Sequence, residues 1–149
     1  METFSYEFTV NASLDAVAAF HQDTRALKKL NPPGIVVQLH RVDPMAEGSV
    51  SEFTLWMGPI PIRWRAIHSN VGINGFTDTH DKGPMAYWKH THSFEYIKEQ
   101  KTRIHETIEH VHPKGLRSLF TRLLFGRIGL TILFTYRNWA TNHHLGGVK

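Results

Sequence analysis

The sequence of 149 residues contains no cysteine. Disulfide bonds, thiolate metal ligands and a cysteine nucleophile are therefore excluded. The Gly-x-Ser-x-Gly and HExxH motifs and the glycine loops that bind phosphate are also missing from it. Nucleophilic hydrolysis of that type, the common zinc proteases and nucleotide chemistry consequently have no support in the sequence.

The composition is that of a globular protein, with 41% apolar and 20% charged residues. A chain of this length fits one domain, and we predict a single domain over residues 1–149. The first residues lack the basic start and the apolar run of a signal peptide, so we expect a cytoplasmic location.

Charge is distributed unevenly, because Glu109 is the last acidic residue and six basic residues follow it. Segment 114–127 combines basic residues with Leu116, Leu119 and Leu123, which is the composition of a basic amphipathic helix. The favoured interpretation is that this apolar stripe packs on the core. Transient contact with an anionic membrane surface is the alternative. Nucleic-acid binding is not expected, since no recognition motif is present.

Hydrophobic periodicity predicts a strand over residues 4–10, a helix over 14–21 and a second short helix ending at Leu30. Six further strands are predicted over 35–42, 49–57, 61–70, 75–81, 86–97 and 101–112. Because short turns separate them, the sheet should be antiparallel. From Leu116 onward the apolar residues recur with the helical period of 3.6 residues, which predicts a helix of about 28 residues. Gly126 and Gly129 are its weak points, and Gly146-Gly147 closes it.

The segment from Phe76 to Phe94 places titratable and aromatic side chains on one face of two strands joined at Gly83-Pro84. Burying such a face is costly unless it lines a pocket or forms a satisfied polar network. On strand 101–112 the even-numbered residues, including Glu106, should likewise face the core.

This order of elements resembles the helix-grip fold, and the central segment with its Trp88-x-His90-x-His92 pattern is similar to bacterial members of the SRPBCC or START-like superfamily. The resemblance implies an α+β fold: a curved, seven-stranded antiparallel sheet wrapped around a long C-terminal helix, with two short helices between strands 1 and 2. It also implies a cavity for a hydrophobic ligand. Within the superfamily, the chain is similar to an uncharacterised branch described as polyketide cyclase/dehydrase-like.

Together these observations predict a protein that binds a small lipid, isoprenoid or polyketide-like molecule, with no cofactor. We expect ten residues to line the cavity: Phe53, Trp64, Asp78, His80, Trp88, His90, His92, Glu106, Ile108 and His110.

Three interpretations of the polar residues stay open. They form a structural network of buried pairs, such as Asp78 with His90 or Glu106 with His92. They form the polar end of a ligand cavity, in which His90, His92 or Glu106 could act as acid or base in a cyclase/dehydratase-type enzyme. Alternatively, His90 and His92 bind a metal ion with Glu106 or His110 as a third ligand. Whether the protein is an enzyme is left open by the sequence, as is its oligomeric state.

Overall fold

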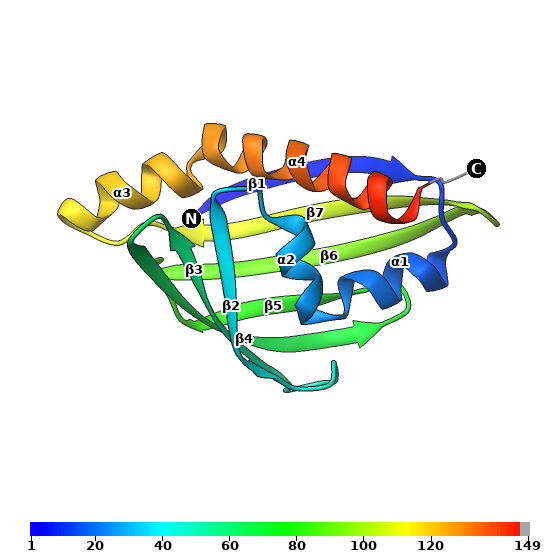
Figure 1. The fold of residues 1–149 in the computed structure, drawn as a ribbon, viewed down its shortest axis with the longest axis horizontal. Coiled ribbons are helices and arrows are strands. Elements are labelled where there is room, and N and C mark those ends of the chain that lie inside the picture. Colours follow the sequence, from blue (N-terminus) through cyan, green and yellow to red (C-terminus); the bar gives the residue numbers. More distant parts are fainter. Residues whose placement is uncertain (147–149) are drawn as a thin grey trace.

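The structure, a computed structural model, describes residues 1–146. Seven antiparallel strands form one sheet in the order β1-β7-β6-β5-β4-β3-β2. The sheet curves, and the helices lie on its concave side (Figure 1). The strands are β1 (Glu2–Val10), β2 (Ile35–Val42), β3 (Val50–Met57), β4 (Ile60–Gly72), β5 (Gly75–Lys82), β6 (Tyr87–Lys98) and β7 (Lys101–Val111). The predicted seven-stranded antiparallel sheet is confirmed.

Short helices connect β1 to β2, as predicted. Helix α1 (Leu14–His21) begins at Ser13, whose side chain accepts a hydrogen bond from the amide of Ala16 at 3.2 Å. The second helix is a 3-10 turn (Thr24–Ala26) followed by the single turn of α2 (Leu27–Leu30). Asp23 caps it by accepting from the amide of Arg25. These helices close one side of the space between sheet and C-terminal helix (Figure 1).

The C-terminal helix is divided into α3 (Leu116–Phe125) and α4 (Arg127–Leu145). The interruption falls at Gly126, one of the two predicted weak points, where the backbone is extended rather than helical. A Cβ at this position would lie 2.2 Å from the carbonyl oxygen of Arg122, so only glycine fits. Gly146 caps the end of α4, and the predicted Gly147 lies outside the described residues.

The inner face of the sheet carries the core. Even-numbered residues of β7 are buried throughout and alternate with partly buried odd ones, which confirms the predicted orientation of that strand. Helix α4 packs on this face through Leu130 and Phe134, both fully buried. The ring of Phe134 lies 5.6 Å from that of Phe4 and 5.5 Å from that of His90. Helix α4 therefore stands directly over the polar segment of the sheet.

Helix α3 does not bury the apolar stripe that the sequence suggested would pack on the core. Leu116, Leu119 and Leu123 are 86%, 70% and 75% exposed. The helix extends beyond the end of α4 (Figure 1), and the residues that it buries are Thr121 and Phe125. The expectation was wrong because the apolar spacing defines a stripe on the helix but does not fix which side of it faces the sheet.

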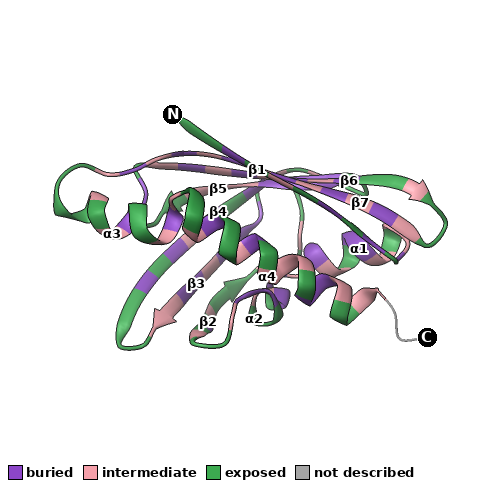
Figure 2. Cartoon of the chain, turned by 90° about the horizontal axis from the view of Figure 1, so that it is seen from above, coloured by how far each residue is buried: buried purple, intermediate pink, exposed green. Residues whose placement is uncertain are grey.

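Exposed apolar side chains continue along α4. Ile128, Ile132 and Trp139 are more than half exposed, and exposed residues recur on the outer turns of both helices in Figure 2. By length and hydropathy, the segment Leu116–Leu145 meets the criteria for a membrane span. A helix that packs on the core of a folded domain meets the same criteria, so this finding alone carries little weight.

Candidate functional site

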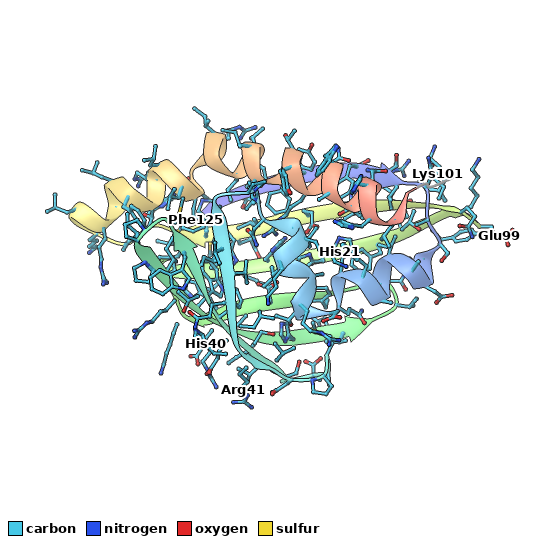
Figure 3. All side chains as sticks on the ribbon, in the orientation of Figure 1. His21, His40, Arg41, Glu99, Lys101 and Phe125 are labelled. Atoms are coloured by element: carbon cyan, nitrogen blue, oxygen red, sulfur yellow. The ribbon has the colours of Figure 1, made fainter. Side chains whose placement is uncertain are left out.

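A cavity of about 120 Å³ lies between the inner face of the sheet, the short helices and α4. Its lining is mainly apolar, with Phe53, Trp64 and Trp88 from the sheet and Phe125 and Leu133 from the C-terminal helices. Phe125 lies toward the α3 end of this space and His21 toward α1 (Figure 3). Small-molecule sites have this character, being apolar with a few convergent polar groups.

Two histidines and two carboxylates meet on the sheet side of the cavity, in a set that we call the polar wall: Asp78, His90 and His92, which line the cavity, and Glu106 behind them. Strand register puts Asp78 opposite His90, and His92 opposite Glu106. His90 Nε2 lies 2.7 Å from Glu106 Oε2, and His92 Nε2 lies 2.9 Å from Asp78 Oδ2. His92 Nδ1 is also 2.9 Å from Glu106 Oε2. Two imidazoles and two carboxylates thus form one chain of contacts, from His90 through Glu106 and His92 to Asp78.

Protonation in the polar wall follows from these contacts. Burial acts to lower the pKa of His92, but Glu106 and Asp78 outweigh it and raise the pKa to about 9. Burial and the neighbouring His92 lower the pKa of His90. Burial would raise the pKa of Glu106, yet the two histidines hold it well below its usual range. At neutral pH, His92 is therefore a cation bridging two carboxylates, and His90 is neutral.

The neutral His90 has a defined tautomer. Because Glu106 is ionised, its oxygen accepts and His90 Nε2 must carry the hydrogen. His90 Nδ1 then offers a lone pair, and its nearest carboxylate oxygen, on Asp78, is 3.8 Å away, beyond hydrogen-bonding distance. Since His90 lines the cavity, this nitrogen is available as an acceptor or base.

The helices bring two further ionisable groups to the cavity. His21 is the last residue of α1, its Nδ1 lies 2.9 Å from the carbonyl oxygen of Val17, and burial lowers its pKa to about 4. Arg137 of α4 lines the cavity, and its Nε donates to the carbonyl oxygen of Leu30 at 3.3 Å. Burial lowers the pKa of Arg137, while the attraction of Glu106 and Asp78 opposes that shift.

Comparison with known proteins identifies the architecture. The sequence matches no family model and no curated protein. A START superfamily protein from Mycobacterium smegmatis superposes with a TM-score of 0.71 at 12% identity, covering 96% of this chain and 96% of its own. The protein has the START-like helix-grip fold.

Two enzymes share the helix-grip fold with this chain. An aromatase/cyclase from Streptomyces sp. R1128 has a TM-score of 0.68 at 13% identity, covering 95% of this chain and 89% of its own. Norcoclaurine synthase from Thalictrum flavum, solved with dopamine and hydroxybenzaldehyde, has a TM-score of 0.68 at 16% identity, covering 98% and 89%. At such identity the likeness establishes the fold and leaves function to be argued from the site.

Of the ten residues predicted to line the helix-grip cavity, six do so: Phe53, Trp64, Asp78, Trp88, His90 and His92. Glu106 lies behind them, joined to both histidines of the polar wall. Ile108 is fully buried in the core. His80 packs edge-on against Trp64, with ring centroids 5.4 Å apart. His110 lies toward the start of β1, beside Glu2 and His112. Parity places these four on the inner face, but strand curvature and their position along the strand take them away from the cavity.

The predicted metal site at His90 and His92 competes with hydrogen bonds that the same side chains make. One ligand atom each from Asp78, His90 and His92 lies within 4.8 Å of the others. However, three of the four ring nitrogens already lie within 3 Å of a carboxylate oxygen. These contacts fit a hydrogen-bonded network, so the geometry favours proton sharing over metal ligation at the polar wall.

Sequence reasoning missed the residues that the helices contribute, His21, Leu133 and Arg137 among them. No motif marks His21, which closes an ordinary amphipathic helix. Arg137 could have been found from its spacing, since it lies one turn beyond the fully buried Phe134 on the same side of α4. Because α4 also carries apolar residues on its exposed side, the sequence pattern did not identify which side faces the cavity.

Proposed function

We propose that the protein binds a small hydrophobic molecule in the cavity between the sheet and α4. The single observation that carries the proposal is a mainly apolar cavity on which a few polar groups converge, including the free acceptor His90 Nδ1. At about 120 Å³ the cavity is close to the size that admits a benzene ring in proteins, roughly 150 Å³. Of the lipid, isoprenoid and polyketide-like classes, this space fits a compact aromatic, polyketide-like molecule best.

Filling the cavity from the helix tests the proposal. Leu133→Trp adds bulk where α4 lines the cavity, whereas Ile132→Trp adds the same bulk on a side chain that is 63% exposed. Native mass spectrometry of the untagged proteins, purified from cells or mixed with small aromatic phenols, would compare them. We expect a bound molecule with the wild type and Ile132→Trp and its loss from Leu133→Trp. Equal binding by all three proteins would contradict the proposal.

A second candidate function is acid/base catalysis on the bound molecule, of the kind that a cyclase or dehydratase needs. His90 favours it, because Glu106 orients the imidazole and Nδ1 remains free to take a proton. The developing imidazolium would be stabilised by the carboxylates of Glu106 and Asp78, and the site would exclude water once a ligand fills it. Catalytic candidates are therefore His90 as base, with His92 and Glu106 as positioning residues.

Deuterium exchange into cyclohexanone, a one-ring apolar ketone, tests this second function by mass spectrometry in D₂O. The base should accelerate exchange at the carbon beside the carbonyl, and His90→Gln should lower the protein-catalysed rate by at least about 100-fold. His105→Gln, on the outer face of β7 and 40% exposed in its side chain, should keep the rate. No acceleration by the wild type would remove the catalytic candidate and leave the binding proposal standing.

The exposed stripe on α3 favours transient contact with an anionic membrane surface. Leu116, Leu119 and Leu123 are exposed, and the basic residues Lys114, Arg117, Arg122 and Arg127 lie in the same segment, with no acidic residue after Glu109. Apolar side chains that enter the interface, flanked by cations that meet anionic headgroups, produce such contact. The helix lies at one end of the cavity, at Phe125, so a membrane-dissolved ligand would meet the protein there.

Vesicle sedimentation measures this contact. We expect binding to vesicles that contain phosphatidylglycerol, weak binding to pure phosphatidylcholine, and loss of binding in Leu119→Gln/Leu123→Gln. The matched control is Val36→Gln, which removes an apolar side chain that is 64% exposed on β2. Binding that is unchanged in the α3 double variant would rule out this surface.

A further inference from the structure

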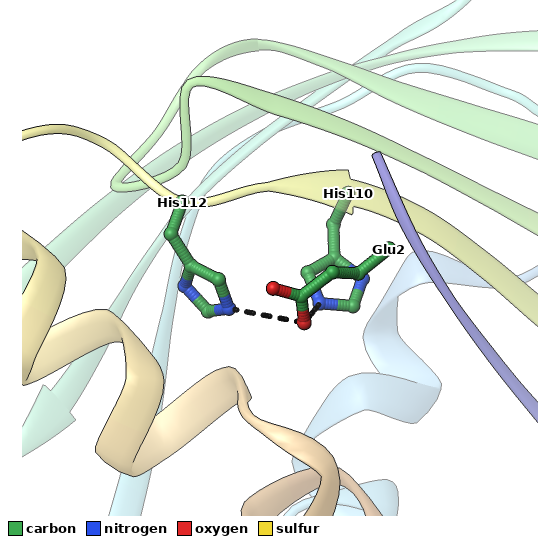
Figure 4. A group of neighbouring side chains, drawn as sticks. All are labelled: Glu2, His110 and His112. Carbon is green, nitrogen blue, oxygen red and sulfur yellow. Dashed lines mark ion pairs between the residues drawn. The ribbon is translucent and has the colours of Figure 1, made fainter.

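A second histidine cluster lies outside the cavity, where the start of β1 meets the end of β7 and α3. We call Glu2, His110 and His112 the end cluster (Figure 4). None of the three lines the cavity. Strand register places Glu2 directly opposite His110, and the buried His112 follows just after the end of β7. The topology thus brings two imidazoles and a carboxylate together from segments that are distant in the sequence.

The histidine nitrogens of the end cluster converge on one oxygen. Glu2 Oε2 lies 3.6 Å from His110 Nε2 and 3.9 Å from His112 Nε2. Both imidazole rings turn toward this carboxylate in Figure 4. The three ligand atoms lie within 4.8 Å of one another. Ligand atoms about 2.0–2.1 Å from a tetrahedral zinc ion lie roughly 3.4 Å apart, so the observed separations surround a space of the right size.

The buried nitrogens of this cluster have no hydrogen-bond partner among the described residues. This holds for both ring nitrogens of His110 and for Nε2 of His112, although the two side chains are only 3% and 2% exposed. Buried imidazole nitrogens normally have partners. In the polar wall each histidine makes a hydrogen bond to a carboxylate, whereas here one oxygen of Glu2 lies just beyond hydrogen-bonding distance of both histidines.

Neighbouring side chains hold the end cluster in position. The hydroxyl oxygen of Thr121, in α3, lies 3.0 Å from His112 Nδ1. This contact fixes the His112 ring with its Nε2 toward Glu2. The ring of Trp88 lies 6.0 Å from that of His110 on the opposite side from Glu2. Arg122 donates to Glu2 Oε1 at 3.3 Å and leaves Oε2 facing the histidines. Metal-binding histidines are commonly held by a partner on their second nitrogen, as His112 is by Thr121, while His110 is held by packing against Trp88.

We propose that Glu2, His110 and His112 bind a divalent transition metal of the zinc class. Two imidazoles and one carboxylate form a donor set that zinc accepts, with a fourth position left for water or another ligand. Glu2 is half exposed, which gives the ion a route from solvent. The ion would join β1 to β7 and, through Thr121, tie α3 to the sheet.

Zinc binding to the untagged full chain, stripped with chelator and dialysed against Zn²⁺, tests the proposal by elemental analysis and calorimetry. We expect one ion per chain, and its loss in Glu2→Gln and in His112→Gln. Thr121→Val should weaken affinity about 10- to 100-fold, because it removes only the group that orients His112. His143→Gln, at an exposed position of α4, and His92→Gln in the polar wall should leave the affinity for zinc unchanged.

Comparison of these variants distinguishes zinc bound at the end cluster from zinc bound at the polar wall. Zinc that is lost in His92→Gln but retained in Glu2→Gln and His112→Gln would place the ion in the cavity and overturn the proposal. Absence of stoichiometric zinc at micromolar concentrations would also overturn it. If His112→Gln fails to fold, Glu2→Gln still decides the matter, since its side chain is 54% exposed and its replacement is conservative. Co²⁺ in place of Zn²⁺ would report four-coordinate geometry through its visible absorption.

Discussion

The polar wall and the end cluster are built from the same residue types on neighbouring strands, and they differ in how their charges are satisfied. In the polar wall, two carboxylates face two histidines, and His92 bridges Asp78 and Glu106 as a cation. In the end cluster, one half-exposed carboxylate faces two buried histidines without a hydrogen bond to either. In the first set each histidine has at least one carboxylate oxygen within 3 Å, whereas in the second neither histidine has one. This difference separates a network of shared protons, with His90 Nδ1 open to the cavity, from a place for a metal ion.

Removing a carboxylate from each region should give the largest contrast. Glu106→Gln leaves a buried histidine cation with one partner fewer, so it should lower the free energy of unfolding by about 3–5 kcal/mol. Glu2→Gln in chelator should change it by less than about 0.5 kcal/mol, because that side chain is half exposed. Urea unfolding monitored by tryptophan fluorescence measures both. Equal losses would show that the end cluster is also a hydrogen-bonded network.

The pH dependence of stability should come from two histidines that line the cavity, His92 of the polar wall and His21 of α1. The pKa of His92 rises from 6.5 to about 9 on folding, so its stabilising contribution is complete below pH 6.5 and is lost as pH rises through 9. The pKa of His21 falls from 6.5 to about 4, so its contribution is present above pH 6.5 and is lost as pH falls toward 4. These two groups predict maximal stability near pH 6.5.

Thermal unfolding across pH 4 to 10 measures this profile. His92→Gln should remove the decline between pH 6.5 and 9 while leaving the acid side in place. His110→Gln should preserve that decline, because it belongs to the other cluster. A decline of the same size in His92→Gln would show that another group is responsible for it.

Replacing one histidine in each region by an apolar residue should give effects of opposite sign. His110→Leu in chelator should stabilise the protein by about 1 kcal/mol, because it removes a buried group that lacks hydrogen bonds. His90→Leu should destabilise it, because Glu106 would lose a donor at 2.7 Å. The denaturant midpoints of the two variants, compared with that of the wild type with and without zinc, measure both changes in stability. Destabilisation by His110→Leu in chelator would mean that His110 already has a partner in solution.

Much of the fold was predictable because its signals are local. Alternation gave the strands and their inner faces, as on β7, and glycine gave the break at Gly126. The contact of His92 with Glu106 was predicted from parity and the spacing of about 4.8 Å between neighbouring strands. The predicted pair of Asp78 with His90 was wrong, because Asp78 bonds diagonally to His92 and lies 3.8 Å from His90. The outer stripe of α3 was misassigned because an amphipathic pattern does not state which element it meets.

The rest of the site depends on distances that no local pattern contains. His110 and His92 have the same parity, yet strand curvature places one beside Glu2 and the other in the cavity. His21 and Arg137 reach the cavity only because α1 and α4 close over the same part of the sheet. Likewise, the end cluster needs the β1–β7 register, which joins residues more than 100 positions apart.

The most direct test of the cavity as a ligand site is the affinity of wild-type protein and Leu133→Trp for phenol and benzene, measured by equilibrium dialysis. The wild type should bind phenol about tenfold more tightly than benzene, since a hydroxyl can donate to His90 Nδ1. Leu133→Trp should bind neither compound measurably. Equal affinities of the two proteins for both compounds would show that the cavity is not the binding site.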